Sequence, residues 1–134
     1  MEDRFIEIFT GLKRAHGCTY INTTPKEGVK LKTKSFVKRE QVTPDHYKNH
    51  LHGVEPSLGI IPINEEDMCK WGCIDIDSYA GFDHQKLIRK IKTLKLPLVV
   101  CRSKSGGAHV FLFSEDFVEA KTMRDKLNQI RAVL

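Results

Sequence analysis

The chain has 134 residues, of which 40% are hydrophobic and 29% charged, and its formal net charge is +5. Such a length and composition suit a single globular domain that builds its core without disulfides, and no apolar run approaches the ~18 residues that would indicate a membrane span. The opening residues, Met-Glu-Asp-Arg, lack the basic and apolar pattern of a secretion signal. We therefore expect a cytoplasmic protein without a membrane partner.

The charge is distributed unevenly along the chain. Residues 26–52 hold seven basic against three acidic residues, residues 53–83 hold one against seven, and residues 84–134 hold eleven against four. An acidic segment between two basic ones is expected where a cation site lies among surfaces that attract polyanions, such as nucleic acid or nucleotide phosphates. The alternative is that the lysines form ordinary solvated faces.

The N-terminal part is expected to contain one helix and short strands. Hydrophobic residues at helical spacing predict a core-packing helix over residues 2–15, with Gly17 after its end. Strands are expected over 18–21 and 29–34, with a turn at 25–28 between them. The alternating lysines of the second strand either protect a sheet edge from aggregation or follow nucleic-acid phosphates. The candidate nucleic-acid-binding residues are Lys30, Lys32, Lys34, Lys38 and Arg39.

A second helix is predicted by Thr43-Pro44, a cap followed by a proline in the first turn, and should run to about Leu51 and stop at Gly53. Three histidines in and after this helix raise the question of a zinc site. Zinc is not favoured, because the nearest cysteines, at 69 and 73, do not form a Cys-x-x-Cys pattern. Residues 57–63 are expected to form an apolar strand, followed by a polar turn over 64–67. The histidines that raise the question of zinc are His46, His50 and His52.

The stretch from Trp71 to Tyr79 predicts the strand that carries the chemistry. With a period of two, Gly72, Ile74 and Ile76 share one face, and Cys73, Asp75 and Asp77 share the other. Two residues along a strand span about 6.6 Å, so the two carboxylates can converge on one or two hard cations. The alternative is an edge strand with an acidic face in water.

Beyond this strand, Asp83 is expected to cap a helix in which Leu87, Ile88, Ile91 and Leu94 follow at helical spacing, and residues 98–102 are expected to form a strand. A Ser/Lys/Gly loop over 103–109 then joins it to an apolar strand, 110–113, as a hairpin. The loop chemistry suits an anion, because glycines allow close approach of backbone N–H groups to a phosphate. By period two, His109, Phe111 and Phe113 share a face. A final helix, from 115 to 132, should bury Phe117, Ala120, Met123, Leu127 and Ile130.

These features in this order resemble the archaeo-eukaryotic primase superfamily. The resemblance is carried by the apolar strand ending in Asp75-Ile76-Asp77, the helix after it, and the Ser-Lys-Ser-Gly-Gly-Ala-His hairpin with its aromatic strand. It covers most of residues 1–130 and is closest to primase-polymerase domains of phages and mobile elements, including those of TOTE conflict systems. It implies an α+β fold, with a mixed, largely antiparallel sheet, an RRM-like core, helices packed on one face and the ligands on the other.

The resemblance also implies template-directed nucleotidyl transfer from NTP or dNTP on a single-stranded DNA template. Asp75 and Asp77 would hold two Mg²⁺ or Mn²⁺ ions, and His109 would join them as a catalytic residue. The triphosphate would be gripped by Ser103, Lys104, Ser105, Gly106, Gly107 and His109.

The chain departs from the family pattern in two places. One residue fewer than usual separates serine from histidine, so either Ser103 or Ser105 takes the serine's part. A third motif with another metal-binding aspartate normally lies further on, and Asp116 and Asp125 follow too closely to supply it. We therefore expect residues 1–134 to be one incomplete catalytic domain, with a lead-in over 1–64 and a metal- and phosphate-binding core over 65–134. A helicase or C-terminal domain would complete the protein, in the bacterial host cytoplasm if a phage encodes it.

Two alternatives have different chemistry. The first is a nucleic-acid-binding module that keeps the fold and has lost catalysis, which Mg²⁺-dependent NTP binding would exclude. The second is a rolling-circle relaxase, suggested by His50-Leu51-His52. Relaxases need that pair on a strand and a tyrosine on a later helix, whereas here the pair follows a proline-capped helix and the last helix has no tyrosine.

Overall fold

The computed structural model describes residues 1–21, 24, 32–78 and 80–134. Within these ranges the strands form two three-stranded sheets, ordered β2-β1-β3 and β4-β6-β5, and every strand pair is antiparallel. The expected α+β class is confirmed. The elements follow the order α1 (Glu2–Ile8), β1 (His16–Ile21), β2 (Thr33–Lys38), α2 (Pro44–Leu51), β3 (Ser57–Gly59), β4 (Met68–Ile76), α3 (His84–Thr93), β5 (Leu98–Arg102), β6 (Ala108–Glu119) and α4 (Ala120–Val133).

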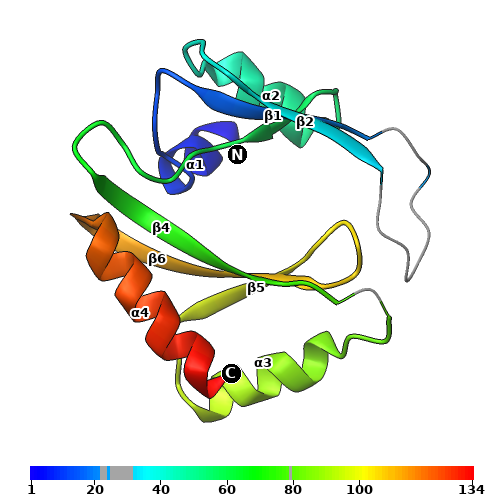
Figure 1. Cartoon of the computed structure of the whole chain (residues 1–134), viewed down its shortest axis with the longest axis vertical. Helices are drawn as coiled ribbons and strands as arrows, with labels where there is room; N and C mark the ends of the chain where they lie inside the picture. Colours follow the sequence, from blue (N-terminus) through cyan, green and yellow to red (C-terminus); the bar gives the residue numbers. More distant parts are fainter. Residues whose placement is uncertain (22–23, 25–31, 79) are drawn as a thin grey trace.

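The β4-β6-β5 sheet carries the main core on one face, which α3 and α4 cover, while α1 lies over the other face (Figure 1). A Cβ on Gly72 would lie 2.6 Å from Leu127 Cδ1, so α4 packs directly on β4 at this glycine. Full burial of each large apolar side chain contributes about 1.5–3 kcal/mol to stability. The apolar core between the sheet and the helices α3 and α4 therefore stabilises the sheet. The buried core residues are Cys69, Ile74, Leu87, Ile91, Ala108, Val110, Leu112, Met123 and Ile130.

Local signals predicted several elements correctly. The helix α2 follows Thr43, whose backbone N–H donates to His46 Nδ1 at 2.9 Å, and it ends before Gly53, which has a φ of 71°. Asp83 caps α3 by accepting from the Lys86 N–H at 2.9 Å. The strand β5 has the expected bounds, Leu98–Arg102.

The prediction of a helix over 2–15 is wrong beyond its first two turns. The helix α1 ends at Ile8, and Gly17 lies inside β1. A Cβ on Gly11 would collide with the Ile61 carbonyl, which accepts from the Leu12 N–H at 2.9 Å. The close approach of the two backbone segments requires glycine at position 11, and the contact with Ile61 replaces a continuation of the helix.

The prediction of a helix from residue 115 is also wrong at its start. The strand β6 continues to Glu119, because its last residues pair with Met68 and Cys69 of β4 beyond a bulge. Phe117 is therefore not a core residue: it is 43% exposed, and Lys70 Nζ lies 5.3 Å from its ring centroid. The remaining helix, α4, buries Met123 and Ile130 as expected.

Two further strands differ from the prediction. Residues 25–31, which hold the predicted turn and the first half of the predicted 29–34 strand, lie outside the described residues, and the described strand β2 runs over Thr33–Lys38 instead. The strand β3 covers only Ser57–Gly59 of the predicted 57–63, since the chain then turns to bond Leu12 through Ile61. Across the described ranges, no helix combines the length and the apolar character needed to cross a bilayer.

Candidate functional site

The face of the β4-β6-β5 sheet that α3 and α4 leave uncovered carries Asp75 and His109, which were predicted to bind metal and phosphate. The bulge between Cys69 and Trp71 sets the alternation so that Trp71, Cys73 and Asp75 point away from α3 and α4. Their Cα partners on β6 are Phe113, Phe111 and His109 in that order. The face is therefore aromatic at one end and polar at the other.

At the polar end, His109 Nε2 lies 3.5 Å from Asp75 Oδ1. The Asp75 side chain is 68% exposed and that of His109 is 43% exposed, so a ligand can reach both. Asp77 follows directly after the strand end at Ile76 and is also exposed. Burial, and then the negative charge of Asp75, raise the pKa of the Cys73 thiol to about 11, so this cysteine is a neutral neighbour of the pair.

The hairpin between β5 and β6 forms a tight loop beside this pair. The Ser103 N–H donates to the Gly107 carbonyl at 2.9 Å, and the Gly106 N–H donates to the Ser103 carbonyl at 3.1 Å. Gly106 has a φ of 93°, which an L side chain rarely adopts. The loop thus presents Lys104 and Ser105 at its tip, with Lys104 exposed.

Gly107 serves the docking of the hairpin on β4. A Cβ on Gly107 would collide with the Ile76 carbonyl and lie 3.0 Å from the Ser78 backbone nitrogen. The Gly107 carbonyl also lies 2.9 Å from His84 Nε2, at the start of α3, and accepts its N–H. Sequence reasoning missed His84, and no local pattern marks it, because its partner lies 23 residues away. Together these contacts hold the loop against the strand end that carries Asp77.

The histidines of α2 have structural partners and do not form a relaxase site. His50 Nδ1 accepts from the Leu58 N–H at 3.0 Å, and its ring stacks on Phe5 at 6.2 Å. His52 Nε2 lies 3.4 Å from Glu2 Oε1. Burial, and then the positive charge of Lys104, lower the pKa of His50.

The donor set on this face fits a hard divalent ion. Mg²⁺ commonly binds through one or two carboxylates and completes its shell with water and substrate phosphates, and Asp75 and Asp77 are exposed carboxylates two residues apart. Among the described residues, no group of three or more His, Cys, Asp or Glu side chains has a metal-binding arrangement. The protein groups therefore suit an ion that shares its ligands with a nucleotide.

Two of the predicted nucleic-acid-binding residues lie on the other sheet, and two more flank its edge strand. Lys34 and Lys38 belong to β2, an edge strand whose residues are all exposed, and Arg39 follows it. Lys32 precedes the strand and is exposed, whereas Lys30 lies outside the described residues. The cationic side chains thus line an edge that is separate from the Asp75 face.

Comparison with protein families assigns most of the chain. A family model described as the archaeo-eukaryotic primase domain of TOTE conflict systems matches residues 14–133. This range includes both sheets, the Asp75–His109 pair and the hairpin, and it begins after α1 and Phe9. No curated protein matches the chain.

Proposed function

The chain belongs to the archaeo-eukaryotic primase family of TOTE conflict systems, and we propose that it transfers nucleotides from NTP or dNTP to a 3′-hydroxyl with release of pyrophosphate, directed by a single-stranded DNA template, during replication of a phage or mobile element. Family membership supports a primase/polymerase-type nucleotidyltransferase that takes nucleotide and DNA substrates and uses divalent metal. The observation that carries the residue assignment is the Asp75–His109 pair beside the docked hairpin.

In this proposal Asp75 and Asp77 hold Mg²⁺ or Mn²⁺. Bound there, the ions supply charge neutralisation at the phosphates and activation of the attacking hydroxyl. The chain's own task is to place the triphosphate. His109 donates from β6, Lys104 contributes a charge at the loop tip, and the turn held by Gly106 orients backbone N–H groups. Either Ser103 or Ser105 adds a hydroxyl donor.

The basic edge strand would bind the template. Lys34 and Lys38 are four residues apart on β2 and so share a face of the strand, and Arg39 follows Lys38, an arrangement that can contact a nucleic-acid backbone. The residues Lys30 and Lys32 would extend the same basic segment. Binding there is electrostatic and needs no base-specific contact.

The proposal is tested by calorimetric titration of an NTP and of the matching nucleoside in Mn²⁺. His109→Ala should weaken NTP binding by about tenfold or more, as loss of a charge-assisted hydrogen bond predicts, and leave nucleoside binding unchanged. An equal loss for both ligands would assign His109 to packing. In the natural gene product, Asp77→Ala should abolish template-directed incorporation. Absence of metal-dependent NTP binding in the wild-type protein would instead favour a nucleic-acid-binding module that has lost catalysis.

A further inference from the structure

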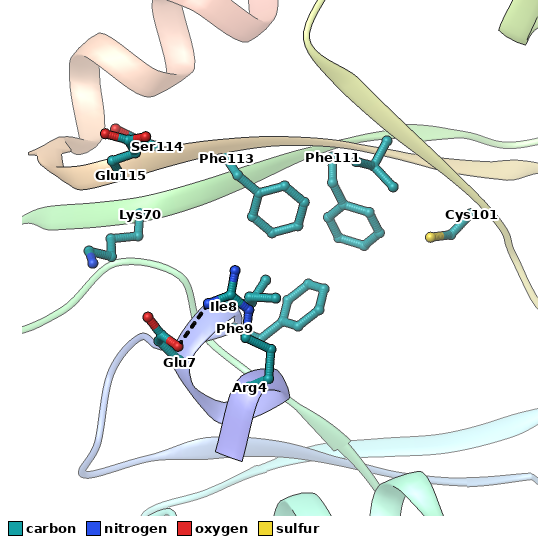
Figure 2. A pocket seen from close by; sticks show the side chains of 11 residues that line it. Arg4, Glu7, Ile8, Phe9, Lys70, Cys101, Phe111, Phe113, Ser114 and Glu115 are labelled. Carbon is teal, nitrogen blue, oxygen red and sulfur yellow. Dashed lines mark hydrogen bonds and ion pairs between the residues drawn. The ribbon is translucent and has the colours of Figure 1, made fainter. Parts of the chain in front are cut away.

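A cavity of about 720 Å³ lies between α1 and the open face of the β4-β6-β5 sheet. Figure 2 shows Phe9 below the sheet and Phe111 and Phe113 pointing down from it, with Cys101 at one end. The ring of Phe9 meets those of Phe111 and Phe113 edge to face, with centroids 5.4 and 5.5 Å apart. Val99 lines the cavity from β5 and is 50% exposed. The wall is thus aromatic and aliphatic and open to solvent.

The rim of the cavity carries charges of both signs. Arg4 and Glu7 of α1 form an ion pair at 3.3 Å, and Lys70 and Glu115 stand at the far side. An apolar pocket of a few hundred Å³ with a few polar groups at its edge is typical of small-molecule sites. Aromatic side chains stack on the face of any nucleobase. The pocket therefore suits a flat heteroaromatic group better than an aliphatic chain.

The cavity lies next to the proposed phosphate site. Cys101 is the Cα partner of His109 across β5 and β6, and the ring centroid of Phe111 lies 6.1 Å from that of His109. Two residues along a strand span about 6.6 Å, so the step from His109 to Phe111 leads from the phosphate-binding group directly into the pocket. A nucleotide whose phosphates lie at His109 can place its base there.

We propose that this cavity binds the base of the incoming nucleotide, and that α1 with Phe9 closes it on the side away from the sheet. The inference rests on the proposed function, because it takes the phosphates to be at His109. The family match begins at residue 14, so α1 and Phe9 stand outside the part shared with the family model. This part of the site sets how tightly the base is held, whereas the hairpin holds the phosphates.

The test fills the pocket without removing a core contact. Val99→Trp places an indole in the cavity from an exposed position, and Val54→Trp is a matched control, since Val54 is also 50% exposed and lies outside the cavity. The probes are ATP, which has a base, and inorganic tripolyphosphate, which has none, each titrated with Mn²⁺. Val99→Trp should bind ATP about tenfold more weakly, as loss of base–aromatic stacking predicts, and bind tripolyphosphate as the wild type does. Val54→Trp should bind both normally.

A second readout uses the wild-type chain. Cys101 is an exposed thiol at the pocket wall, whereas Cys18 and Cys69 are buried. ATP should slow the alkylation of Cys101 by iodoacetamide several-fold more than tripolyphosphate at equal occupancy, because the base covers the thiol.

The outcomes separate the two proposals. Unchanged ATP affinity in Val99→Trp, or equal protection of Cys101 by the two probes, overturns the base pocket while the phosphate site stands. Weaker binding of single-stranded DNA with unchanged ATP affinity also overturns it, since the cavity then holds a template base. If wild-type protein binds neither ATP nor tripolyphosphate, the phosphate site itself fails, and the base pocket with it.

Discussion

Asp75 and His109 lie directly opposite each other in the β4–β6 pair, with His109 Nε2 3.5 Å from Asp75 Oδ1. Both side chains are accessible to solvent, and exposed ion pairs contribute little to stability. The pair is therefore not needed to hold the sheet together, and the core on the other face does that. The carboxylate suits a cation and the imidazole suits an anion, so one strand pair offers both halves of a metal–nucleotide site.

The first prediction concerns the metal. Asp75→Asn should weaken Mn²⁺ binding by about tenfold or more, since even the outer partners of metal ligands typically cost about 10–100-fold when removed. The thermal midpoint should hardly change, because exposed substitutions usually stay within about 0.5 kcal/mol. Paramagnetic broadening or calorimetry measures the affinity. Asp116→Asn, an exposed aspartate of β6, is the control and should bind Mn²⁺ normally. Equal affinities in the wild type and Asp75→Asn would remove this site.

The second prediction concerns His84, which we expect to position the hairpin without touching the nucleotide. Its Nε2 donates to the Gly107 carbonyl, so His84→Ala should loosen the loop and lower NTP affinity several-fold while Mn²⁺ affinity stays unchanged. His84→Gln keeps an amide N–H that can reach the same carbonyl, and it should restore most of the NTP affinity. Calorimetry with the two ligands provides the comparison. Failure of the glutamine variant to rescue binding would argue against the hydrogen bond as the cause.

The elements that were predicted correctly depend on short-range chemistry. A proline after Thr43 and a carboxylate at Asp83 start helices wherever the rest of the chain lies. The alternation that puts Asp75 on the opposite face from Ile74 is equally local. These signals were enough to place Asp75 and His109 on faces of strands, whereas Asp77, predicted on the same strand, lies just beyond its end.

The errors came from partners far away in the sequence. The end of α1 is set by Gly11 against the Ile61 carbonyl, and the length of β6 is set by pairing with Met68. Neither contact leaves a local pattern, so propensity alone extended one helix and began another too early. Two further features also depend on partners far away in the sequence and leave no local pattern. They are the strand register that sets His109 opposite Asp75 and the hydrogen bond from His84 to Gly107.

The third prediction concerns the basic edge strand. Reversing the charges of Lys34 and Lys38 to glutamate should weaken single-stranded DNA binding and flatten its dependence on salt, by up to about 0.7 in the log–log slope for each phosphate that is no longer neutralised. NTP affinity should not change, because these residues lie on the other sheet. Fluorescence anisotropy over a salt series measures both quantities. Reversing Lys121 and Lys126 of α4 to glutamate is the control, because it changes the net charge by the same amount, and an equal effect there would mean that net charge, not the β2 edge, governs binding.

The last prediction concerns the stability of α2 in acid. In the folded chain the pKa of His50 lies below its ordinary value of 6.5, because burial and the charge of Lys104 disfavour the imidazolium. The unfolded chain therefore binds the proton more readily, and stability that is fully present above about pH 6.5 is lost as the pH falls through that value toward the lowered folded pKa. Protonation would also break the bond from the Leu58 N–H to Nδ1, since that nitrogen then becomes a donor.

The measurement is the thermal midpoint at about pH 7.5 and about pH 5.5, on either side of the ordinary histidine pKa. The wild type should lose stability at the lower pH, and His50→Asn should lose less of it, because the amide oxygen can accept from Leu58 without titrating. His52→Asn is the matched control from the end of the same helix, where the side chain is exposed beside Glu2, and it should keep the wild-type pH dependence. If His50→Asn and His52→Asn respond to acid alike, the loss arises elsewhere. The first alternative is then His46, whose pKa is lowered by burial and by His16.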